Sequence, residues 1–384
     1  MNIAFYAPLK SPNSPTPSGD RQIARHLIRA LKLASHTVEL ASELKSYEGE
    51  GDRKQQDFLR SEGGAEACRL TERIISGKQS RPDLWLTYHL YHKAPDWIGP
   101  EVSAALDIPY VVAEASISPK QANGKWQDGY RAAGRAISHA DLILGLNPRD
   151  AECVGVHMKP CAQYETLAPF IDIAPFGKDR RERKQLRHKL NGRAKQKLNE
   201  NRIWLTAVGM MRKGDKTESY RQLANALKRI EDLPWSLFII GDGEESGNIL
   251  PMFHEFQNPV IWLGEIPSSQ LPENYGAMDI LAWPSVNEAL GMVFLEAGGS
   301  GLPVVAGHTD GVASIVHHNK TGLLSPPGDT AVFAQNLRTL ICDETRRDEM
   351  GQAAAFHIGE YHSIEVASQR LDQLLKQVAT EFPS

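Results

Sequence analysis

Two glutamates with seven residues between them stand in the most informative stretch of the sequence, PSVNEALGMVFLEAGGSGLPVVAG, residues 284 to 307. Glu288 lies in a polar loop after an expected strand, and Gly291 marks the expected start of a helix that carries Glu296. A glycine lets a ligand approach the backbone, and a helix N-terminus offers N–H groups to a diphosphate. Ionised carboxylates accept strong hydrogen bonds from hydroxyls. We therefore expect one glutamate to bind a sugar and the other a ribose.

A basic loop follows another expected strand, in the segment VGMMRKGDKTESY from residue 208 to residue 220. Loops at the carboxyl ends of parallel strands are the usual ligand sites of doubly wound sheets. A cation placed there would stabilise the negative charge that builds on a departing diphosphate. Arg212 and Lys216 are the candidates, with Lys213 as the rival to Lys216. The alternative is a pair of ordinary solvated loop cations.

The N-terminal half carries titratable residues at two expected strand ends. The segment LTYHLYHKAPDW, residues 86 to 97, contains His89 and His92, and His89 is the favoured candidate for a general base or a sugar contact. Histidines beside tyrosines also often serve only in packing. After the next strand, Glu114 is either an acceptor-side residue or a buried carboxylate with hydrogen bonds.

The sequence has no metal-binding signature. It contains no Asp-x-Asp motif, and its four cysteines form no Cys-x-x-Cys pair. We expect four free thiols, no catalytic metal and no other cofactor, so that Arg, Lys and a helix end would balance the diphosphate charge.

Short apolar runs alternate with amphipathic segments along the whole chain, which is typical of parallel sheets covered by helices. The amphipathic segments include residues 20–31, 126–137, 219–230 and 331–340. Ten runs, in two groups of five, predict two doubly wound α/β domains. The predicted strands are Ile3–Ala7, Thr37–Ala41, Leu84–Tyr88, Tyr110–Ala113, Leu142–Gly145, Ile203–Val208, Ser236–Ile240, Val260–Leu263, Ile280–Trp283 and Pro303–Ala306.

The C-terminal half resembles the retaining glycosyltransferases of family four, also called group one, which have the GT-B architecture of two Rossmann-like domains facing across a cleft. The spacing of Glu288 and Glu296 is similar to the two-glutamate signature of that family. Further similar segments are TLAPFID at 166–172, FIIGDGEE at 238–245, VIWLGEIPSSQLPENYGAMDILAWPS at 260–285 and DGVASIVHHNKTGLLSPPGD at 310–329.

The resemblance implies a role for each matching residue. Glu288 would contact the hydroxyls of the transferred sugar and Glu296 those of the ribose, while Arg212 and Lys216 would stabilise the leaving diphosphate. The backbone of Leu290, Gly291, Met292 and Val293 would hold the diphosphate, and Gly264, Glu265 and Ile266 would flank the nucleobase. Gly19 stands where many relatives have paired glycines near the donor phosphates; Ser18 or Asp20 could cap the helix there.

The domain organisation follows from these segments. We expect an acceptor-side domain over residues 1–172, a basic linker over 173–200 and a nucleotide-sugar-binding domain over 201–362, with a last helix at about 363–380 that could pack back on the first domain. The stretch from Lys178 to Lys197 is either a solvated helix or a contact with anionic lipid or an acidic acceptor. Residues 46–64, rich in Glu, Gly, Arg and Gln, are expected to form a mobile loop.

Composition limits the function classes. The formal net charge of −4 gives no reason to expect nucleic-acid binding. No apolar run approaches the roughly 20 residues that span a bilayer, and we expect no signal peptide.

The expected activity is a metal-independent, retaining hexosyl transfer from a UDP- or GDP-type sugar to a carbohydrate or glycolipid acceptor. We expect it in bacterial polysaccharide or glycolipid synthesis, in the cytoplasm or peripherally on the inner membrane face. The alternatives are a nucleotide-sugar epimerase and a non-catalytic nucleotide-binding partner subunit; a nicotinamide dehydrogenase is disfavoured because no Gly-x-Gly-x-x-Gly follows the first strand of either half.

Overall fold

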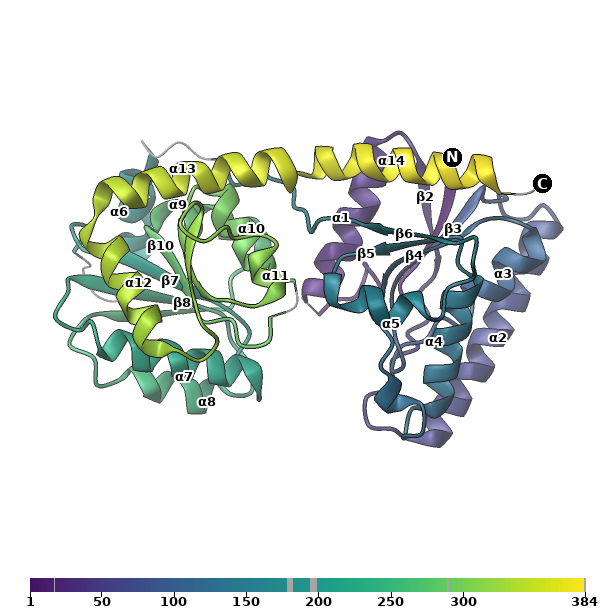
Figure 1. Cartoon of the computed structure of the whole chain (residues 1–384), viewed down its shortest axis with the longest axis horizontal. Coiled ribbons are helices and arrows are strands. Elements are labelled where there is room, and N and C mark those ends of the chain that lie inside the picture. Colours follow the sequence, from purple (N-terminus) through teal and green to yellow (C-terminus); the bar gives the residue numbers. More distant parts are fainter. Residues whose placement is uncertain (17, 178–181, 194–198, 289, 383–384) are drawn as a thin grey trace. The chain divides into compact units, whose positions relative to one another are not determined.

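The computed structural model describes residues 1–16, 18–177, 182–193, 199–288 and 290–382 (Figure 1). The contacts within the chain divide it into two compact units. The first unit contains Met1–Ala168 and Ile364–Ser384, and the second contains Pro169–Ser363. Residues 169–172, expected at the end of the first domain, therefore belong to the second unit.

The first unit is a six-stranded sheet in the order β2-β1-β3-β4-β5-β6, in which all neighbouring strands are parallel. Its strands are β1 (Asn2–Tyr6), β2 (Thr37–Ser42), β3 (Leu84–Leu90), β4 (Tyr110–Ala115), β5 (Leu142–Gly145) and β6 (Gln163–Thr166). Its helices are α1 (Gly19–Leu33), α2 (Arg53–Ile75), α3 (Gly99–Leu106), α4 (Gln127–His139), α5 (Ala151–Gly155) and α14 (Ile364–Glu381). The central strands β3, β4 and β5 are buried almost throughout, as strands covered on both faces must be.

The second unit repeats this plan, with strand order β12-β11-β10-β7-β8-β9 and parallel pairing throughout. Its strands are β7 (Ile203–Val208), β8 (Trp235–Ile240), β9 (Val260–Gly264), β10 (Ile280–Trp283), β11 (Val304–Gly307) and β12 (Gly322–Ser325). Its helices are α6 (Arg183–Arg193), α7 (Asp215–Lys228), α8 (Ser246–Ile249), α9 (Leu271–Ala277), α10 (Met292–Gly299), α11 (Asp310–Ala313), α12 (Thr330–Cys342) and α13 (Glu344–Tyr361). The prediction of two doubly wound domains is confirmed.

All ten predicted strands are present, three of them with the predicted bounds, but β6 and β12 were missed. β6 reads QYET and lies at the edge of its sheet, where half-exposed polar residues give no apolar run. β12 is buried but only four residues long, Gly322–Ser325, and it begins with a glycine. Short strands of this kind are stabilised by pairing with a neighbouring strand, and the hydrophobic periodicity of the sequence does not show that pairing.

The prediction of a mobile loop over residues 46–64 is wrong, because α2 begins within it at Arg53. Asp52 caps this helix, and its carboxylate accepts hydrogen bonds from the N–H groups of Lys54 and Gln55. The buried side of α2 is formed by small and apolar residues at helical spacing: Leu59, Gly63, Ala67, Leu70 and Ile74. The remaining residues of α2 are so polar that the composition of the segment did not indicate this narrow stripe of buried residues.

The last helix, α14, packs against α1 of the first unit. Leu371 and Leu375 of α14 are fully buried or nearly so, and Asp372 lies 3.1 Å from Nε2 of His36, which follows α1. The C-terminal segment is therefore part of the core of the first unit.

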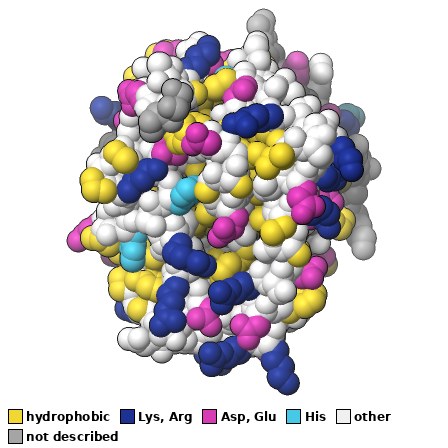
Figure 2. Space-filling view, turned by 90° about the vertical axis from the view of Figure 1, so that its right-hand side faces the viewer, with side chains coloured by type: hydrophobic (Ala, Val, Ile, Leu, Met, Phe, Trp, Pro, Cys, Tyr) yellow, Lys and Arg dark blue, Asp and Glu magenta, His cyan; other side chains and the backbone are white. Residues whose placement is uncertain are grey.

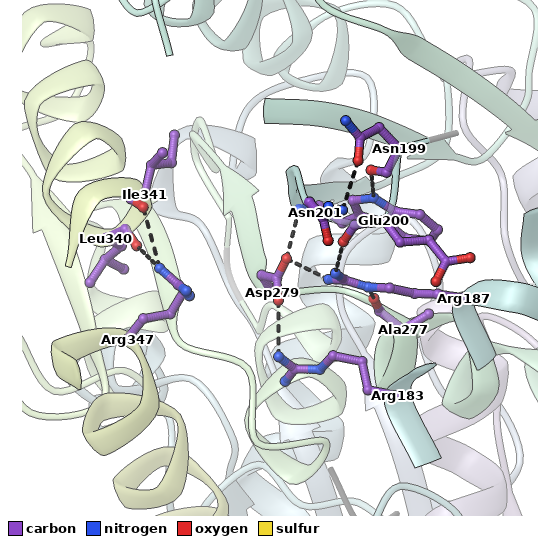
Figure 3. Close-up of polar contacts among 11 residues, drawn as sticks. Arg183, Arg187, Asn199, Glu200, Asn201, Ala277, Asp279, Leu340, Ile341 and Arg347 are labelled. Carbon is purple, nitrogen blue, oxygen red and sulfur yellow. Dashed lines mark hydrogen bonds and ion pairs between the residues drawn. The ribbon is translucent and has the colours of Figure 1, made fainter. Parts of the chain in front are cut away.

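The basic stretch predicted as a solvated helix is partly buried instead (Figure 3). Arg187 of α6 is only 8% exposed, and its guanidinium lies 2.5 Å from a carboxylate oxygen of Asp279. Arg183 reaches the other oxygen of Asp279 at 2.9 Å, and the backbone N–H of Trp204 also donates to this carboxylate, at 2.7 Å. These arginines thus tie α6 to the sheet. Lys178 and Lys197, the ends of the predicted stretch, lie outside the described residues.

Across the described residues, no helix is long and apolar enough to cross a membrane. Figure 2 shows one face of the molecule, on which hydrophobic side chains are interrupted by charges of both signs, with Lys and Arg gathered in the lower part of the view. The described part of this face offers no continuous apolar patch to a partner.

Candidate functional site

The carboxyl ends of β7, β8 and β9 in the second unit are joined by backbone hydrogen bonds. Gly209 N–H donates to Ile240 C=O at 3.0 Å, and Gly241 N–H donates to Gly264 C=O at 2.8 Å. A Cβ at Gly241 would lie 1.9 Å from the carbonyl oxygen of Gly209, and Gly241 has a φ of +136°. Glycine is required there for the strands to approach this closely. The loops after these strands therefore form one connected edge.

Lys216 and Glu288 meet at this edge. The ammonium group of Lys216, in the first turn of α7, lies 2.5 Å from Oε2 of Glu288, which follows β10. The same ammonium lies 5.4 Å from the ring centre of Trp283, the last residue of β10. Both charged side chains are about one fifth exposed, so a ligand can reach them from solvent. A lysine and a carboxylate in contact offer a cation for phosphate and an acceptor for hydroxyls.

The loop that carries Glu288 is held in a strained backbone conformation. Ser285 and Asn287 have φ values of +55° and +50°, which non-glycine residues adopt at a cost. Side chains of α7 hold the loop: Ser219 Oγ accepts from Val286 N–H at 3.0 Å, and Asp215 accepts from the Asn287 amide at 3.1 Å. These hydrogen bonds hold the backbone of the loop that carries Glu288.

The N-terminus of α10 lies beside this loop. Gly291 precedes the helix with a φ of +39°, and no side chain in the described part of the chain caps it. The N–H groups of Met292 and Val293 begin the helix, while that of Phe294 already donates to Gly291 C=O at 2.8 Å. An uncapped helix start without a side-chain acceptor is suited to an anion.

Glu296 is more enclosed than the sequence indicated. It is 3% exposed, and its Oε2 accepts a hydrogen bond of 2.9 Å from the hydroxyl of Tyr275 on α9. Burial, together with the charge of Glu296, raises the pKa of Tyr275 well above its ordinary value, so Tyr275 is the donor. No sequence pattern indicated this pair, because the two residues lie on different helices.

The other predicted residues of the second unit lie around this edge. The structure brings Lys216 to Glu288, whereas Arg212 and Lys213 are exposed in the loop after β7. Glu265 is exposed after β9, and Gly264, Ile266 and Leu290 are partly exposed. Trp262 of β9 was not singled out from the sequence; it is 46% exposed, and its indole N–H donates to Gly241 C=O at 2.9 Å.

A second cluster lies in the first unit, at the ends of β3 and β4. His89 Nδ1 lies 2.9 Å from a carboxylate oxygen of Asp20, in the first turn of α1. Glu114 of β4 is 6% exposed, and its Oε2 accepts from Leu146 N–H at 3.1 Å. His89 and Glu114 have φ values of +58° and +64°. Two non-glycine residues in the left-handed region on neighbouring strands are the kind of strain that gathers at functional sites.

The environment of this cluster shifts its protonation equilibria. Burial is the main cause that raises the pKa of Glu114 to about 7; Asp150 and Asp20 add to this rise, and His89 opposes it. Burial alone would lower the pKa of His89, but the hydrogen bond and charge of Asp20 outweigh it and raise that pKa. Burial also raises the pKa of Asp150. Asp150, which no sequence motif indicated, therefore belongs to this cluster.

Gly19 and His92 were also predicted in the first unit, and their surroundings differ from those of this cluster. Ser18 caps α1, as expected, by accepting from Arg21 N–H at 3.2 Å. A Cβ at Gly19 would meet nothing within 4 Å, so no close approach in the described chain requires a glycine there. The ring of His92 lies against Trp126, with 5.8 Å between ring centres. Among the described residues, no three His, Cys, Asp or Glu side chains are arranged to hold a metal ion.

Comparisons with known proteins show what the second unit and the fold resemble. Residues 189–356 match the model of the family described as glycosyl transferases group 1. The chain is 36% identical over 125 residues to a sulfoquinovosyl transferase of Arabidopsis thaliana, which covers 32% of this chain and 24% of that protein. It is 32% identical over 164 residues to a D-inositol 3-phosphate glycosyltransferase of Corynebacterium urealyticum, covering 41% of this chain and 38% of that protein.

A third relative spans more of the chain. A GDP-mannose-dependent alpha-(1-6)-phosphatidylinositol monomannoside mannosyltransferase of Mycobacterium tuberculosis is 29% identical over 204 residues, 50% of this chain and 51% of that protein. The chain thus spans from 24% to 51% of the length of these curated relatives.

Solved structures share the whole fold. A sucrose-phosphate synthase of Thermosynechococcus elongatus superposes with a TM-score of 0.75 at 18% identity, over 99% of both chains. The Anabaena protein HepE, solved with UDP and glucose, gives 0.69 at 18% identity, over 97% of this chain and 99% of that one. These likenesses show the fold alone. The chain therefore has the GT-B fold, and its residues 189–356 match the group 1 glycosyl transferases.

Proposed function

We propose that this chain transfers a sugar from a nucleotide-diphosphate donor to a hydroxyl acceptor, with retention of the anomeric configuration and without a catalytic metal. The observation that carries the proposal is the contact of Lys216 with Glu288, 2.5 Å apart, beside the uncapped start of α10. A cation, a hydroxyl-binding carboxylate and open backbone N–H groups are what the diphosphate and sugar of such a donor require.

The reaction follows from these groups. The diphosphate would bind at the start of α10, and Lys216 would turn from Glu288 toward its oxygens, with Arg212 as a further cation. Glu288 would then accept hydrogen bonds from the sugar hydroxyls. The bond between the anomeric carbon and the diphosphate oxygen breaks, with its electrons passing to the diphosphate, while the acceptor oxygen bonds to the same carbon. The acceptor proton passes to the leaving phosphate oxygen on the same face, which retains the configuration.

Donor and acceptor classes are part of the proposal. We propose a UDP- or GDP-linked hexose, supported by the relative whose name specifies GDP-mannose and by the HepE complexes with UDP. We propose a carbohydrate or glycolipid acceptor and a role in bacterial polysaccharide or glycolipid synthesis. A nucleotide-sugar epimerase is disfavoured, because the relatives are named as transferases.

We propose a cytoplasmic location, with peripheral contact to anionic lipid through the basic stretch. Arg183 and Arg187 are committed to Asp279, and Lys189 lies 2.6 Å from a carboxylate oxygen of Glu273, so the exposed Lys184 of α6 is left to support this contact. Sedimentation with vesicles of anionic lipid, compared with neutral vesicles, tests it: equal binding to both contradicts the lipid contact.

Calorimetric titration with UDP, GDP and ADP, without metal and then with excess chelator, tests the donor site. One nucleotide should bind, with the same affinity in the presence of chelator. Glu288→Gln should keep nucleotide binding, since Glu288 faces the sugar, and should lower the rate of transfer or donor hydrolysis by about a hundredfold or more. A chain that binds none of the three nucleotides would be the non-catalytic partner, and an epimer formed from the donor alone would favour the epimerase.

A further inference from the structure

Trp283, the last residue of β10, contacts both members of the pair formed by Lys216 and Glu288. Its indole Nε1 lies 3.5 Å from Oε2 of Glu288, and the ammonium group of Lys216 lies 5.4 Å from the centre of its ring. The ammonium group lies 2.5 Å from the same Oε2. One aromatic side chain therefore meets both charged groups of the proposed donor site.

The ring of Trp283 is held by two neighbouring elements and is fully buried. Tyr220 of α7 packs edge-on against it, with 4.9 Å between ring centres, and the hydroxyl of Tyr220 donates to Gly209 C=O at 2.7 Å. A Cβ at Gly209, which follows β7, would lie 3.0 Å from two ring carbons of Trp283, so only a glycine leaves room for the ring. The indole is therefore oriented without help from Lys216 or Glu288.

The backbone of Glu288 is also held independently of Lys216. Its C=O accepts from the hydroxyl of Thr309 at 3.1 Å, and its N–H donates to Ser285 C=O at 3.3 Å. The carboxylate, by contrast, shares its Oε2 between Lys216 and Trp283. A lysine that turns toward a diphosphate leaves that oxygen, whereas a buried indole N–H only donates and carries no charge that a phosphate would attract.

We propose that Trp283 is a positioning residue, whose indole N–H keeps Oε2 of Glu288 in place once Lys216 has turned to the diphosphate. The other carboxylate oxygen of Glu288 then accepts from the sugar hydroxyls. Trp283 is fully buried, so it does not stack on the sugar and acts through Glu288. This inference rests on the proposed transfer reaction and adds a residue that orients the sugar-binding glutamate.

The length of the contact indicates how it responds to a ligand. A distance of 3.5 Å is long for an N–H···O hydrogen bond, and the buried N–H of a tryptophan usually has a partner. Lys216, at 2.5 Å, is the nearer neighbour of the same oxygen. Departure of Lys216 therefore lets the bond from Trp283 to Glu288 shorten. A ring that served only in packing would show no such response.

NMR of the indole N–H groups of the full chain, labelled with nitrogen-15, tests this response. The chain has seven tryptophans, and the Trp283 signal is assigned by its absence from a Trp283→Phe or a Trp283→Tyr variant. UDP and GDP are titrated without metal. The indole proton of Trp283 should move to lower field with the nucleotide that binds, because its hydrogen bond shortens. Lys216→Met should produce the same displacement without any nucleotide.

Kinetics separate positioning from packing. Trp283→Phe keeps an aromatic ring and removes the N–H. It should lower the rate at which the diphosphate is released from UDP-glucose or GDP-mannose by about tenfold, while the affinity for the free diphosphate changes by less than about twofold. The double variant with Glu288→Gln should be no slower than Glu288→Gln alone, because both substitutions act through one carboxylate.

Trp235→Phe is the matched control. Trp235 of β8 is fully buried in the same unit, and its indole N–H donates to the backbone C=O of Ile230 at 2.9 Å. Its substitution removes the same group from the same kind of environment. Any loss of stability should resemble that of Trp283→Phe, but the rate of diphosphate release should stay that of the wild type.

Three outcomes would overturn the inference: an indole signal of Trp283 that stays in place both with nucleotide and in Lys216→Met, equal losses of rate and diphosphate affinity in Trp283→Phe, or additive losses in the double variant. Wild-type turnover that Trp283→Phe leaves unchanged removes the role of Trp283 alone. A wild-type chain that binds no nucleotide and turns over no donor contradicts the proposed transfer reaction itself.

Discussion

At the scale of single residues, each unit carries a carboxylate next to a lysine or histidine side chain at the carboxyl end of its sheet. In the second unit these are Glu288 and Lys216, and in the first they are Asp20 and His89. The sequence predicted Glu288, Lys216 and His89 as candidates from their places after strands. It gave Asp20 only as a capping residue, because the partner of a side chain is decided by residues far along the chain.

A first prediction concerns whether Lys213 or Lys216 contacts the diphosphate. Lys216→Met should weaken binding of the nucleoside diphosphate by about tenfold to a hundredfold, the loss of one hydrogen bond to a charged group. Lys213→Met should weaken it far less, because Lys213 is exposed and Lys216 is the lysine beside Glu288. Calorimetry with both variants measures this, and a larger loss in the Lys213 variant would assign the diphosphate contact to Lys213.

Glu114 gives a prediction about pH. Its pKa in the folded chain, about 7, lies above the ordinary value of 4.5, so the folded state holds a proton that the unfolded state releases. The stabilisation is complete below about pH 4.5 and is lost as the pH rises through about 7, in total on the order of 3 kcal/mol. The difference in unfolding free energy between wild type and Glu114→Gln should therefore fall with pH over this range in urea titrations. A difference that stays constant would show that Glu114 titrates normally.

At the scale of elements, α2 and α6 differ most from what the sequence indicated. Both helices are so polar that their composition predicted segments exposed to solvent. Each helix is nevertheless held by a few buried residues: a narrow stripe of small and apolar residues on α2, and Arg187 on α6. Strand positions were predicted well because β-rich apolar runs are strong local signals. The polar helices were not predicted well, because one buried ion pair leaves no periodic pattern of apolar residues in the sequence.

The buried carboxylate of Asp279 gives the prediction for α6. Asp279→Asn would leave Arg183 and Arg187 without their ion pair, and removing one partner of a buried pair costs about 3–5 kcal/mol. Unfolding in urea should show a lower midpoint for the second unit. Asp232→Asn is the control, because its pair with Arg338 lies at the surface and should contribute little. Equal losses in both variants would contradict a structural role for the Asp279 pair.

At the scale of the whole molecule, the chain crosses from the first unit to the second and returns at its end. The segment after Ser363 belongs to the first unit, where α14 packs on α1. The first unit is therefore assembled from both ends of the sequence, and the second from the middle.

A truncation after Ser363 tests this arrangement. It would expose the buried residues of α1 and remove Leu371, Leu374 and Leu375, so the first unit should lose its cooperative unfolding transition. The second unit keeps every element of its sheet and should still bind the nucleotide in calorimetry. Loss of nucleotide binding together with the first transition would show that the second unit does not fold by itself.

The sequence by itself determined the two doubly wound domains, the places of ten strands and the motifs of the family, because these are local patterns of apolar residues and turns. Only the tertiary structure decided that Lys216 contacts Glu288 and that Tyr275 donates to Glu296. It also decided that Arg187 is buried against Asp279. On the neighbouring strands β3 and β4, it gives His89 and Glu114 the same left-handed backbone conformation. Each of these depends on strand register and helix docking, which bring together residues from distant parts of the chain. Periodicity shows which face of an element is buried, and the packed fold decides which side chains share that face.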